Sequence, residues 1–313
     1  MGEDMRVAVF GAAGFLGRAV VARLKRDDIR VRAITRVGDR VDRADENVAS
    51  GDLLTAPLPP LVEGCDAVIN CAARVHVLRR EDPAAADAAF AAMNTDFAVR
   101  LGQAAKAATV RRFVQLSSVA AIGSVTPAGT TADDAITPRP DTAYGRSKLA
   151  ADQALQRLNS EQFVVVSLRP PTIHGPAVGA LFARLDRAAR YGVPLPLAGI
   201  DNRRSIAFVD NIADAVACAA RFGPAGSYLV SDSEPLSSAA LYRMLLRLHG
   251  HGDRAFALPK AIVWAAARMI LRKRATSLLG SCAIDGGRFA TAFGWQPVIP
   301  LDLALSRTIS GAG

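Results

Sequence analysis

Two patterns of apolar and polar positions, one typical of buried strands and one of helices, follow each other along the first 176 residues of this sequence. Short apolar runs, bounded by glycine, proline or polar residues, have the length and composition of buried strands. Between them lie segments with apolar residues at helical spacing, such as Val20, Val21 and Leu24 in 18–26. This repeated order predicts an α/β fold built on a doubly wound parallel sheet. The strands are predicted at 6–10, 30–36, 47–54, 66–73, 113–123 and 163–176.

A further apolar stripe predicts a helix that begins near Tyr144. The stripe consists of Leu149, Ala150, Ala154 and Leu155. Tyr144 and Lys148 are four residues apart, so a helix holds the phenol and the ammonium on one face, one turn apart. Taken alone, such a pair is also explained by a packed ring beside a solvated lysine. Its meaning therefore depends on the rest of the chain.

Composition limits the class of protein. The 313 residues are 50% hydrophobic and 21% charged, as in ordinary globular domains. The four cysteines match no zinc spacing and are too few for a disulfide scaffold, so we expect no metal site and a reducing, cytoplasmic compartment. The N-terminus has acidic residues before its first apolar run, which argues against a secretory signal.

We also expect no transmembrane segment. The nearest candidate, 257–274, is interrupted by Lys260 and Arg268 and ends in Arg272-Lys273-Arg274. We interpret it as a helix packed on the core with a solvated end, and a membrane-surface role is the alternative.

The net charge of +9 suggests an anionic partner. The basic residues are scattered, and no aromatic-interleaved basic patch, helix-turn-helix or zinc signature is present. We therefore expect a small anionic ligand rather than nucleic acid.

A glycine loop follows the first predicted strand. Gly11, Gly14 and Gly17 lie between that strand and the next helix, in the spacing G-x-x-G-x-x-G. Glycine lets a pyrophosphate approach the backbone, and the helix N-terminus attracts the anion. The third glycine allows the helix to pack closely on the strand. The arrangement predicts a dinucleotide site.

Residues at later strand ends extend this prediction. Arg36 stands at the end of the second strand, where an acidic residue would favour NAD, and a guanidinium suits the 2′-phosphate of NADP. We therefore expect NADP rather than NAD, with stacking on adenine or simple exposure as alternatives for Arg36. Asp52 is a candidate acceptor for the adenine amino group, or a turn residue. The small residues Ala72 and Ala73 would let a cofactor lie close.

Ligands of doubly wound sheets bind beyond the carboxyl ends of the strands. This rule places the glycine loop, Ala72–Ala73, Ser117–Ser118 and Pro170–Ile173 along one edge, together with Tyr144. The motifs "GAAGFLG", "NCAARVHV", "RRFVQLSSVAAIG", "YGRSK" and "RPPTIHGP" occur in this order. In these motifs, and over essentially its whole length, the sequence resembles the extended short-chain dehydrogenase/reductases, the NAD-dependent epimerase/dehydratase family.

The resemblance implies a catalytic Ser118, Tyr144 and Lys148. Tyr144 would exchange the proton of a sugar hydroxyl while nicotinamide carries the hydride, and we expect Lys148 to lower the phenol pKa. Ser118 would stabilise charge on the reacting oxygen. The resemblance implies a cofactor site of Gly11, Gly14, Phe15, Leu16, Gly17, Arg36, Asp52, Leu53, Ala72, Ala73, Ser117, Tyr144, Lys148, Pro170 and Ile173. It gives Asn94 a structural role.

The second half resembles a narrower set, bacterial UDP-sugar 4-epimerases and UDP-4-keto-6-deoxy-N-acetylhexosamine 4-reductases of surface polysaccharide (lipopolysaccharide) synthesis. This resemblance implies a substrate site of Val75, Ser118, Thr172, Arg204 and Arg274. Arg204 would bind the diphosphate, with a surface ion pair as the alternative. His76 would border the sugar, or be an ordinary loop histidine. His174 replaces the usual tyrosine before Gly-Pro, which leaves a sugar contact there open.

The expected organisation follows from the same resemblance. Residues 1–175 form a dinucleotide-binding Rossmann domain, and 176–313 mainly a nucleotide-sugar-binding domain, with about 203–232 returning to the first. A homodimer is implied. The expected function is hydride transfer at C4 of a UDP-sugar, by an epimerase or a reductase. The alternatives are a reductase of another small carbonyl compound and a non-catalytic NADP-sensing regulator.

Overall fold

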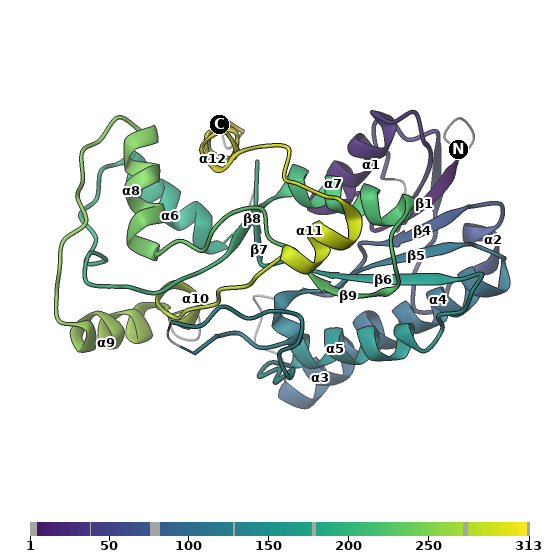
Figure 1. Cartoon of the computed structure of the whole chain (residues 1–313), viewed down its shortest axis with the longest axis horizontal. Coiled ribbons are helices and arrows are strands. Elements are labelled where there is room, and N and C mark those ends of the chain that lie inside the picture. Colours follow the sequence, from purple (N-terminus) through teal and green to yellow (C-terminus); the bar gives the residue numbers. More distant parts are fainter. Residues whose placement is uncertain are drawn as a thin grey trace.

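The computed structural model describes residues 5–37, 39–75, 82–127, 129–176, 180–271 and 275–311. Its centre is a parallel sheet of seven strands in the order β3-β2-β1-β4-β5-β6-β9 (Figure 1). The strands are β1 (Arg6–Phe10), β2 (Arg30–Thr35), β3 (Glu46–Ala49), β4 (Ala67–Asn70), β5 (Arg112–Leu116), β6 (Val164–Arg169) and β9 (Gly226–Leu229). The predicted doubly wound α/β fold is confirmed.

Helices cover both faces of this sheet (Figure 1). One face carries α1 (Phe15–Lys25), α7 (Val209–Arg221) and α11 (Gly287–Phe293). The other carries α2 (Pro59–Val62), α4 (Phe97–Ala107) and α5 (Ala143–Gln156), with α3 (Pro83–Phe90) against α5. Because strands such as β4 are buried on both faces, their residues are almost all apolar.

A second, smaller unit lies beyond the carboxyl edge of the sheet, on the left of Figure 1. It has a two-stranded parallel sheet of β7 (Thr172–His174) and β8 (Ile206–Phe208). Its helices are α6 (Ala180–Arg190), α8 (Ser238–Leu248), α9 (Lys260–Leu271), α10 (Ala275–Leu279) and α12 (Leu301–Ser310). They enclose an apolar cluster of their own. Within the described ranges, no helix is long and apolar enough to cross a bilayer.

Several strands end earlier than their apolar runs predict. β3 stops at Ala49, and Gly51, with a φ of 68°, turns the chain away. The run at 163–176 divides into β6 and β7 because Pro170 and Pro171 have no N–H to donate to a sheet. The residues after β3 thus form a loop at the carboxyl edge, whereas those after Pro171 form the separate strand β7.

The helix predicted in 257–274 exists as α9, but it is not a core helix. Val263 is its one buried residue, and half of its apolar side chains are exposed: Ala261, Ile262, Ala265, Met269 and Ile270. The segment therefore packs on an apolar core by one side, through Val263, Trp264 and Ala267, and the prediction was wrong for the apolar side that stays exposed.

Candidate active site

Tyr144 lies in the first turn of α5 and meets Ser118. Thr142 caps this helix by accepting a hydrogen bond from the Gly145 N–H at 3.0 Å. The side chains of Tyr144 and Ser118 are hydrogen-bonded. The Tyr144 ring also packs edge-on against Phe90, with 6.1 Å between ring centroids. The phenol is thus fixed in direction beside the hydroxyl of Ser118, which the family resemblance implied for the same site.

Gly145 allows this approach, and the sequence analysis missed it. A Cβ on Gly145 would lie 2.3 Å from the Ala120 carbonyl oxygen, well inside van der Waals contact. Ala120 belongs to the short turn at Val119–Ala121 that Ser118 caps, accepting from the Ala120 N–H at 3.1 Å. Glycine after the tyrosine therefore lets the serine turn pack directly on the start of α5.

Burial, not a neighbouring cation, dominates the titration of Tyr144. Burial raises the pKa of the phenol above its ordinary 10, and the hydrogen bond from Ser118 opposes this rise. The sequence analysis expected Lys148 to lower the phenol pKa. In the protein alone the shift has the opposite direction, because the partly buried site desolvates the phenolate.

Lys148 lies one turn further along α5 and is only 1% exposed. Its Nζ donates to the Leu116 carbonyl oxygen at 2.8 Å, and stands 5.9 Å from the centroid of the Tyr144 ring. Burial lowers the pKa of Lys148 to about 8, and the charge of Asp152 opposes that fall. The ammonium is therefore held against the end of β5, near the phenol.

Asp152, a second residue that sequence reasoning missed, forms a buried network with Arg169 and Ser117, and its charge acts on Lys148. Its Oδ2 accepts from Arg169 Nε and from Ser117 Oγ, both at 2.8 Å. Burial raises the pKa of the Asp152 carboxyl, whereas Arg169 and Ser117 act to lower it. The signal in the sequence was its spacing, since Tyr144, Lys148 and Asp152 follow each other at four-residue steps on one helical face.

Ser117 and Ser118 point to different partners, as adjacent residues leaving a strand do. Ser118 meets Tyr144, whereas Ser117 is buried and donates to Asp152. Its hydroxyl is thus engaged inside the protein.

Asn94 joins the loop after β4 to the helix of Tyr144. It lies in a π-helical turn at Ala91–Asp96, a distortion often found at functional sites. Its Oδ1 accepts from the Arg74 N–H at 2.8 Å, and its Nδ2 donates to Ser147 Oγ at 3.0 Å. Asn94 therefore holds α5 against the loop that follows β4. These contacts agree with the structural role that the resemblance implies for Asn94.

The glycine loop has the shape of a phosphate cradle. Gly11 has a φ of 72°, and a Cβ there would lie 2.7 Å from the Ala72 backbone nitrogen. A Cβ on Gly17 would lie 2.1 Å from the Gly11 carbonyl oxygen. Gly14 caps α1 without a side chain, and the first turn of this helix has no acidic residue. Bare backbone and the positive end of a helix dipole fit a pyrophosphate at this point.

The other predicted cofactor residues stand around this loop at the same edge. Arg36 is exposed at the end of β2. Asp52 is in a turn, and its Oδ1 accepts from the Leu54 N–H at 3.0 Å. Of the remaining predicted residues, Phe15 is exposed, Leu16, Leu53, Ala73 and Ile173 are partly buried, and Ala72 and Pro170 are buried.

The predicted substrate residues differ from one another in exposure and in their hydrogen-bond partners. Val75 and Thr172 are exposed. Arg204 is half-buried and donates from Nη1 to the Gly280 carbonyl oxygen at 2.9 Å, at the end of α10. His174 points away from the edge, since it is fully buried and its Nδ1 bonds to Thr308 Oγ1 at 2.9 Å. Arg274 and His76 lie outside the described residues.

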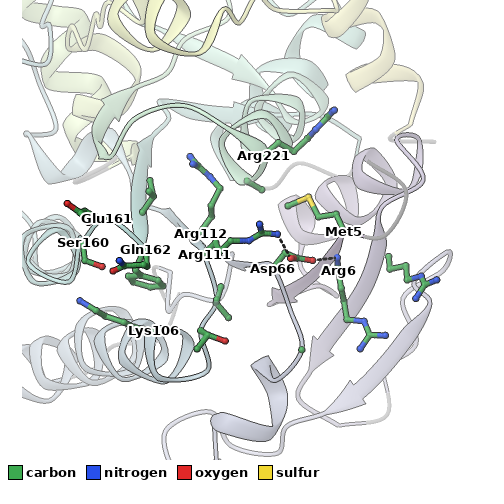
Figure 2. Close-up of a pocket in the computed structure, with 17 residues that line it drawn as sticks. Met5, Arg6, Asp66, Lys106, Arg111, Arg112, Ser160, Glu161, Gln162 and Arg221 are labelled. Carbon is green, nitrogen blue, oxygen red and sulfur yellow. Dashed lines mark hydrogen bonds and ion pairs between the residues drawn. The ribbon is translucent and has the colours of Figure 1, made fainter. Parts of the chain in front are cut away.

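A hollow of about 1200 Å³ lies at the opposite, amino edge of the sheet, away from the candidate active site. Figure 2 shows Arg6, Arg111 and Arg112 along it, at the starts of β1 and β5. Arg111 pairs with Asp66 at 2.6 Å, and Arg112 donates to three carbonyl oxygens at the end of α7. These cations stabilise the fold, and none of Ser118, Tyr144 and Lys148 lines the hollow.

The chain is similar in sequence and in fold to known proteins. The model of the NAD dependent epimerase/dehydratase family matches residues 7–230. A UDP-glucose 4-epimerase of Vibrio cholerae is 31% identical over 245 residues, which cover 76% of this chain and 74% of the relative.

Two further similarities extend over nearly the whole chain. A 3-diazoavenalumate denitrifying reductase of Streptomyces sp is 28% identical, covering 95% of this chain and 97% of the relative. A solved structure, MoeE5 in complex with UDP-glucuronic acid and NAD, superposes with a TM-score of 0.77, 22% identity and 98% coverage of both chains. The last similarity shows the shared fold.

Proposed function

The chain belongs to the NAD dependent epimerase/dehydratase family, and from this membership we propose that it epimerises a UDP-linked sugar at C4. The observation that carries the proposal is the group of Ser118, Tyr144 and Lys148 at the carboxyl edge of the sheet, beside a glycine loop that fits a pyrophosphate. The similarity to a UDP-glucose 4-epimerase and to a UDP-sugar complex supports the substrate class.

The proposed reaction moves one proton and one hydride. A bound nicotinamide would supply the hydride chemistry, accepting the hydride of C4 and returning it to the other face of the sugar. Tyr144 accepts the proton of the C4 hydroxyl as the C–H bond breaks, and gives it back when the C–H bond re-forms. Ser118, whose hydroxyl is hydrogen-bonded to the phenol in the free protein, would turn its one proton to the reacting oxygen and so stabilise its charge.

The protein alone does not make Tyr144 a good base, because burial raises its pKa. A positive nicotinamide beside the phenol would favour the phenolate, so base strength would be highest when the oxidised cofactor is present. Lys148 contributes a buried positive charge near the same ring and is placed to hold the ribose hydroxyls of the cofactor. Because the phenolate would form mainly when oxidised nicotinamide is bound, Tyr144 would remove a proton only in the enzyme that holds its cofactor.

We assign the cofactor site to the residues around the glycine loop, with Arg36 at the adenosine end. An exposed guanidinium at the end of β2 supports NADP, because it matches the charge of a 2′-phosphate. The NAD complex of the structural relative supports NAD instead. Titration with both dinucleotides, followed by nicotinamide or protein fluorescence, decides between them.

Arg204 is the proposed contact of the substrate diphosphate. Desolvation lowers the pKa of its guanidinium, and the described part of the chain gives it carbonyl oxygens but no carboxylate partner. An arginine in this state favours an anionic ligand. Val75 and Thr172, both exposed, are proposed sugar contacts, and Arg274 a nucleotide contact.

A 4-keto reductase is the second candidate. It would use the same residues, with Tyr144 donating a proton to the ketone oxygen, but it must exchange its cofactor at each turnover. The exposed Arg36 and the similarity to a reductase over 95% of the chain favour this candidate. A role as an NADP-sensing regulator is disfavoured because the chain keeps both Tyr144 and Lys148. Surface polysaccharide synthesis and a homodimer through α4 and α5 complete the proposal.

The deciding experiment begins with release of any bound dinucleotide from the purified protein. UDP-sugars are then supplied with and without NADPH or NADH, and the absorbance of reduced nicotinamide is followed. Interconversion of two C4 epimers without net cofactor consumption is the expected result. Stoichiometric oxidation of NADPH by a UDP-4-keto sugar would instead establish the reductase, and inactivity with all nucleotide sugars would overturn both.

A further inference from the structure

The outward face of α9 is apolar and uncovered. The outward-facing residues are Ile262, Ala265, Ala266, Met269 and Ile270, at the spacing of one helical stripe. Ile262 is 55% exposed, Met269 79% and Ile270 73%. In Figure 1 the helix lies at the far end of the second unit, away from the central sheet.

The opposite side of α9 explains how the helix is held. Val263 is buried, and Trp264 and Ala267 pack partly against the apolar cluster of the second unit. The helix therefore has two apolar sides, and the interior of this chain covers one of them. The segment before it adds exposed Phe256 and Leu258. Large apolar side chains gathered in this way usually mark an interaction site.

Charge indicates the partner. Between Asp253 and Asp285 the sequence has no acidic residue but has six basic ones, Arg254, Lys260, Arg268, Arg272, Lys273 and Arg274. Arg254, Lys260 and Arg268 are exposed, and Arg268 lies over the Trp264 ring, 5.3 Å from its centroid. Lys260 pairs with Asp201, an exposed residue from another segment. An exposed apolar stripe, on a helix that carries exposed cations and no carboxylate, is complementary to a surface that is apolar inside and anionic outside.

We propose that α9 docks this protein on the surface of an anionic lipid bilayer, with the helix lying in the plane of the interface. The apolar stripe would enter the boundary between headgroups and acyl chains, and the basic residues would meet the lipid phosphates. With twelve residues the helix is about 18 Å long, too short to span the roughly 30 Å hydrocarbon core. A second copy of the chain is a poorer partner, because it would bring the same exposed cations, Arg254, Lys260 and Arg268, to the contact.

The test measures binding of the full chain to sedimenting vesicles. The wild-type protein should partition onto vesicles of phosphatidylcholine with phosphatidylglycerol, and much less onto phosphatidylcholine alone. The double variant Met269→Glu/Ile270→Glu places two charges on the outward stripe, and its partition should fall at least tenfold. A matched control, Val298→Glu/Leu303→Glu, makes the same change at exposed apolar positions outside α9 and should bind like wild type.

Three outcomes would overturn the proposal. They are no binding of wild-type protein to anionic vesicles, equal binding of the α9 variant and wild type, and equal loss in the control variant. Light scattering with the same proteins identifies self-association: a mass that falls only in the α9 variant, without vesicle binding, would assign this face to a second copy. Unchanged circular dichroism and turnover of UDP-sugar would show that the α9 variant remains folded, so this result is separable from a failure of the proposed function.

Discussion

Replacement of Asp152 by asparagine tests the buried network behind Tyr144 and Lys148. The variant keeps the size of the side chain and removes its charge. Arg169 is 8% exposed and Lys148 1% exposed, so both cations would remain buried without this carboxylate. Removing one partner of a buried ion pair typically costs about 3–5 kcal/mol. We expect a loss of that order in the free energy of unfolding, measured with urea at pH 7.

The same variant should change the pH profile of turnover. Burial lowers the pKa of Lys148 to about 8, and Asp152 opposes this fall. Without Asp152 the folded-state pKa of Lys148 drops further, so the lysine loses its proton at a lower pH. The alkaline limb of the profile, which we attribute to loss of the Lys148 charge beside the phenol, should therefore begin at a lower pH than in wild type.

A matched control separates this effect from any loss of an ion pair. Asp87 pairs with Arg146 of α5 at 2.9 Å, and both side chains are 53% exposed. Asp87→Asn makes the same chemical change at the surface, so it should cost about 0–1 kcal/mol and leave the pH profile unchanged. The reasoning is refuted if Asp152→Asn has an unaltered alkaline limb, or if it is no less stable than Asp87→Asn.

Three other substitutions probe separate parts of the structure. Gly17→Ala puts a Cβ 2.1 Å from the Gly11 carbonyl oxygen, so dinucleotide affinity should fall at least tenfold in a fluorescence titration; unchanged affinity would contradict the cradle. Arg36→Ala should weaken NADPH binding about tenfold and leave NADH binding unchanged; equal effects on both would remove Arg36 from the 2′-phosphate. Burial lowers the pKa of His174 to about 4. Between about pH 4 and pH 6.5 the unfolded chain therefore binds more protons than the folded protein, and wild type loses stability as the pH falls through this range. His174→Phe should show a smaller loss over this window in denaturant midpoints, and an identical pH dependence would show that His174 does not cause it.

The sequence predicted the fold because local periodicity and strand composition agree along the first 176 residues. The α/β class and the parallel, doubly wound sheet were confirmed. Element ends were less accurate, because apolar residues such as Leu53 and Ile122 continue beyond the hydrogen-bonded strand into the carboxyl-edge loops. The predicted strand 163–176 divides at Pro170 and Pro171, and these prolines were a signal in the sequence that could have placed the break.

The candidate site was likewise predictable only in part. Tyr144 and Lys148 are joined by one helical turn, so their proximity follows from spacing alone. Asp152 shares that face, but its partner Arg169 comes from β6, and sequence does not give the contact between a helix and a strand. The outward face of α9 was also not predictable, because apolar periodicity identifies a helix face without saying whether the chain itself covers it.

Tyr144→Phe is the most direct test of proton transfer by this phenol. The variant and wild type are loaded with the same dinucleotide, mixed with UDP-glucose or the UDP-sugar found active, and followed by the absorbance of reduced nicotinamide in a single turnover. We expect Tyr144→Phe to bind the dinucleotide and the sugar like wild type and to transfer hydride at least about 100-fold more slowly. Hydride transfer at the wild-type rate would show that another group moves the proton.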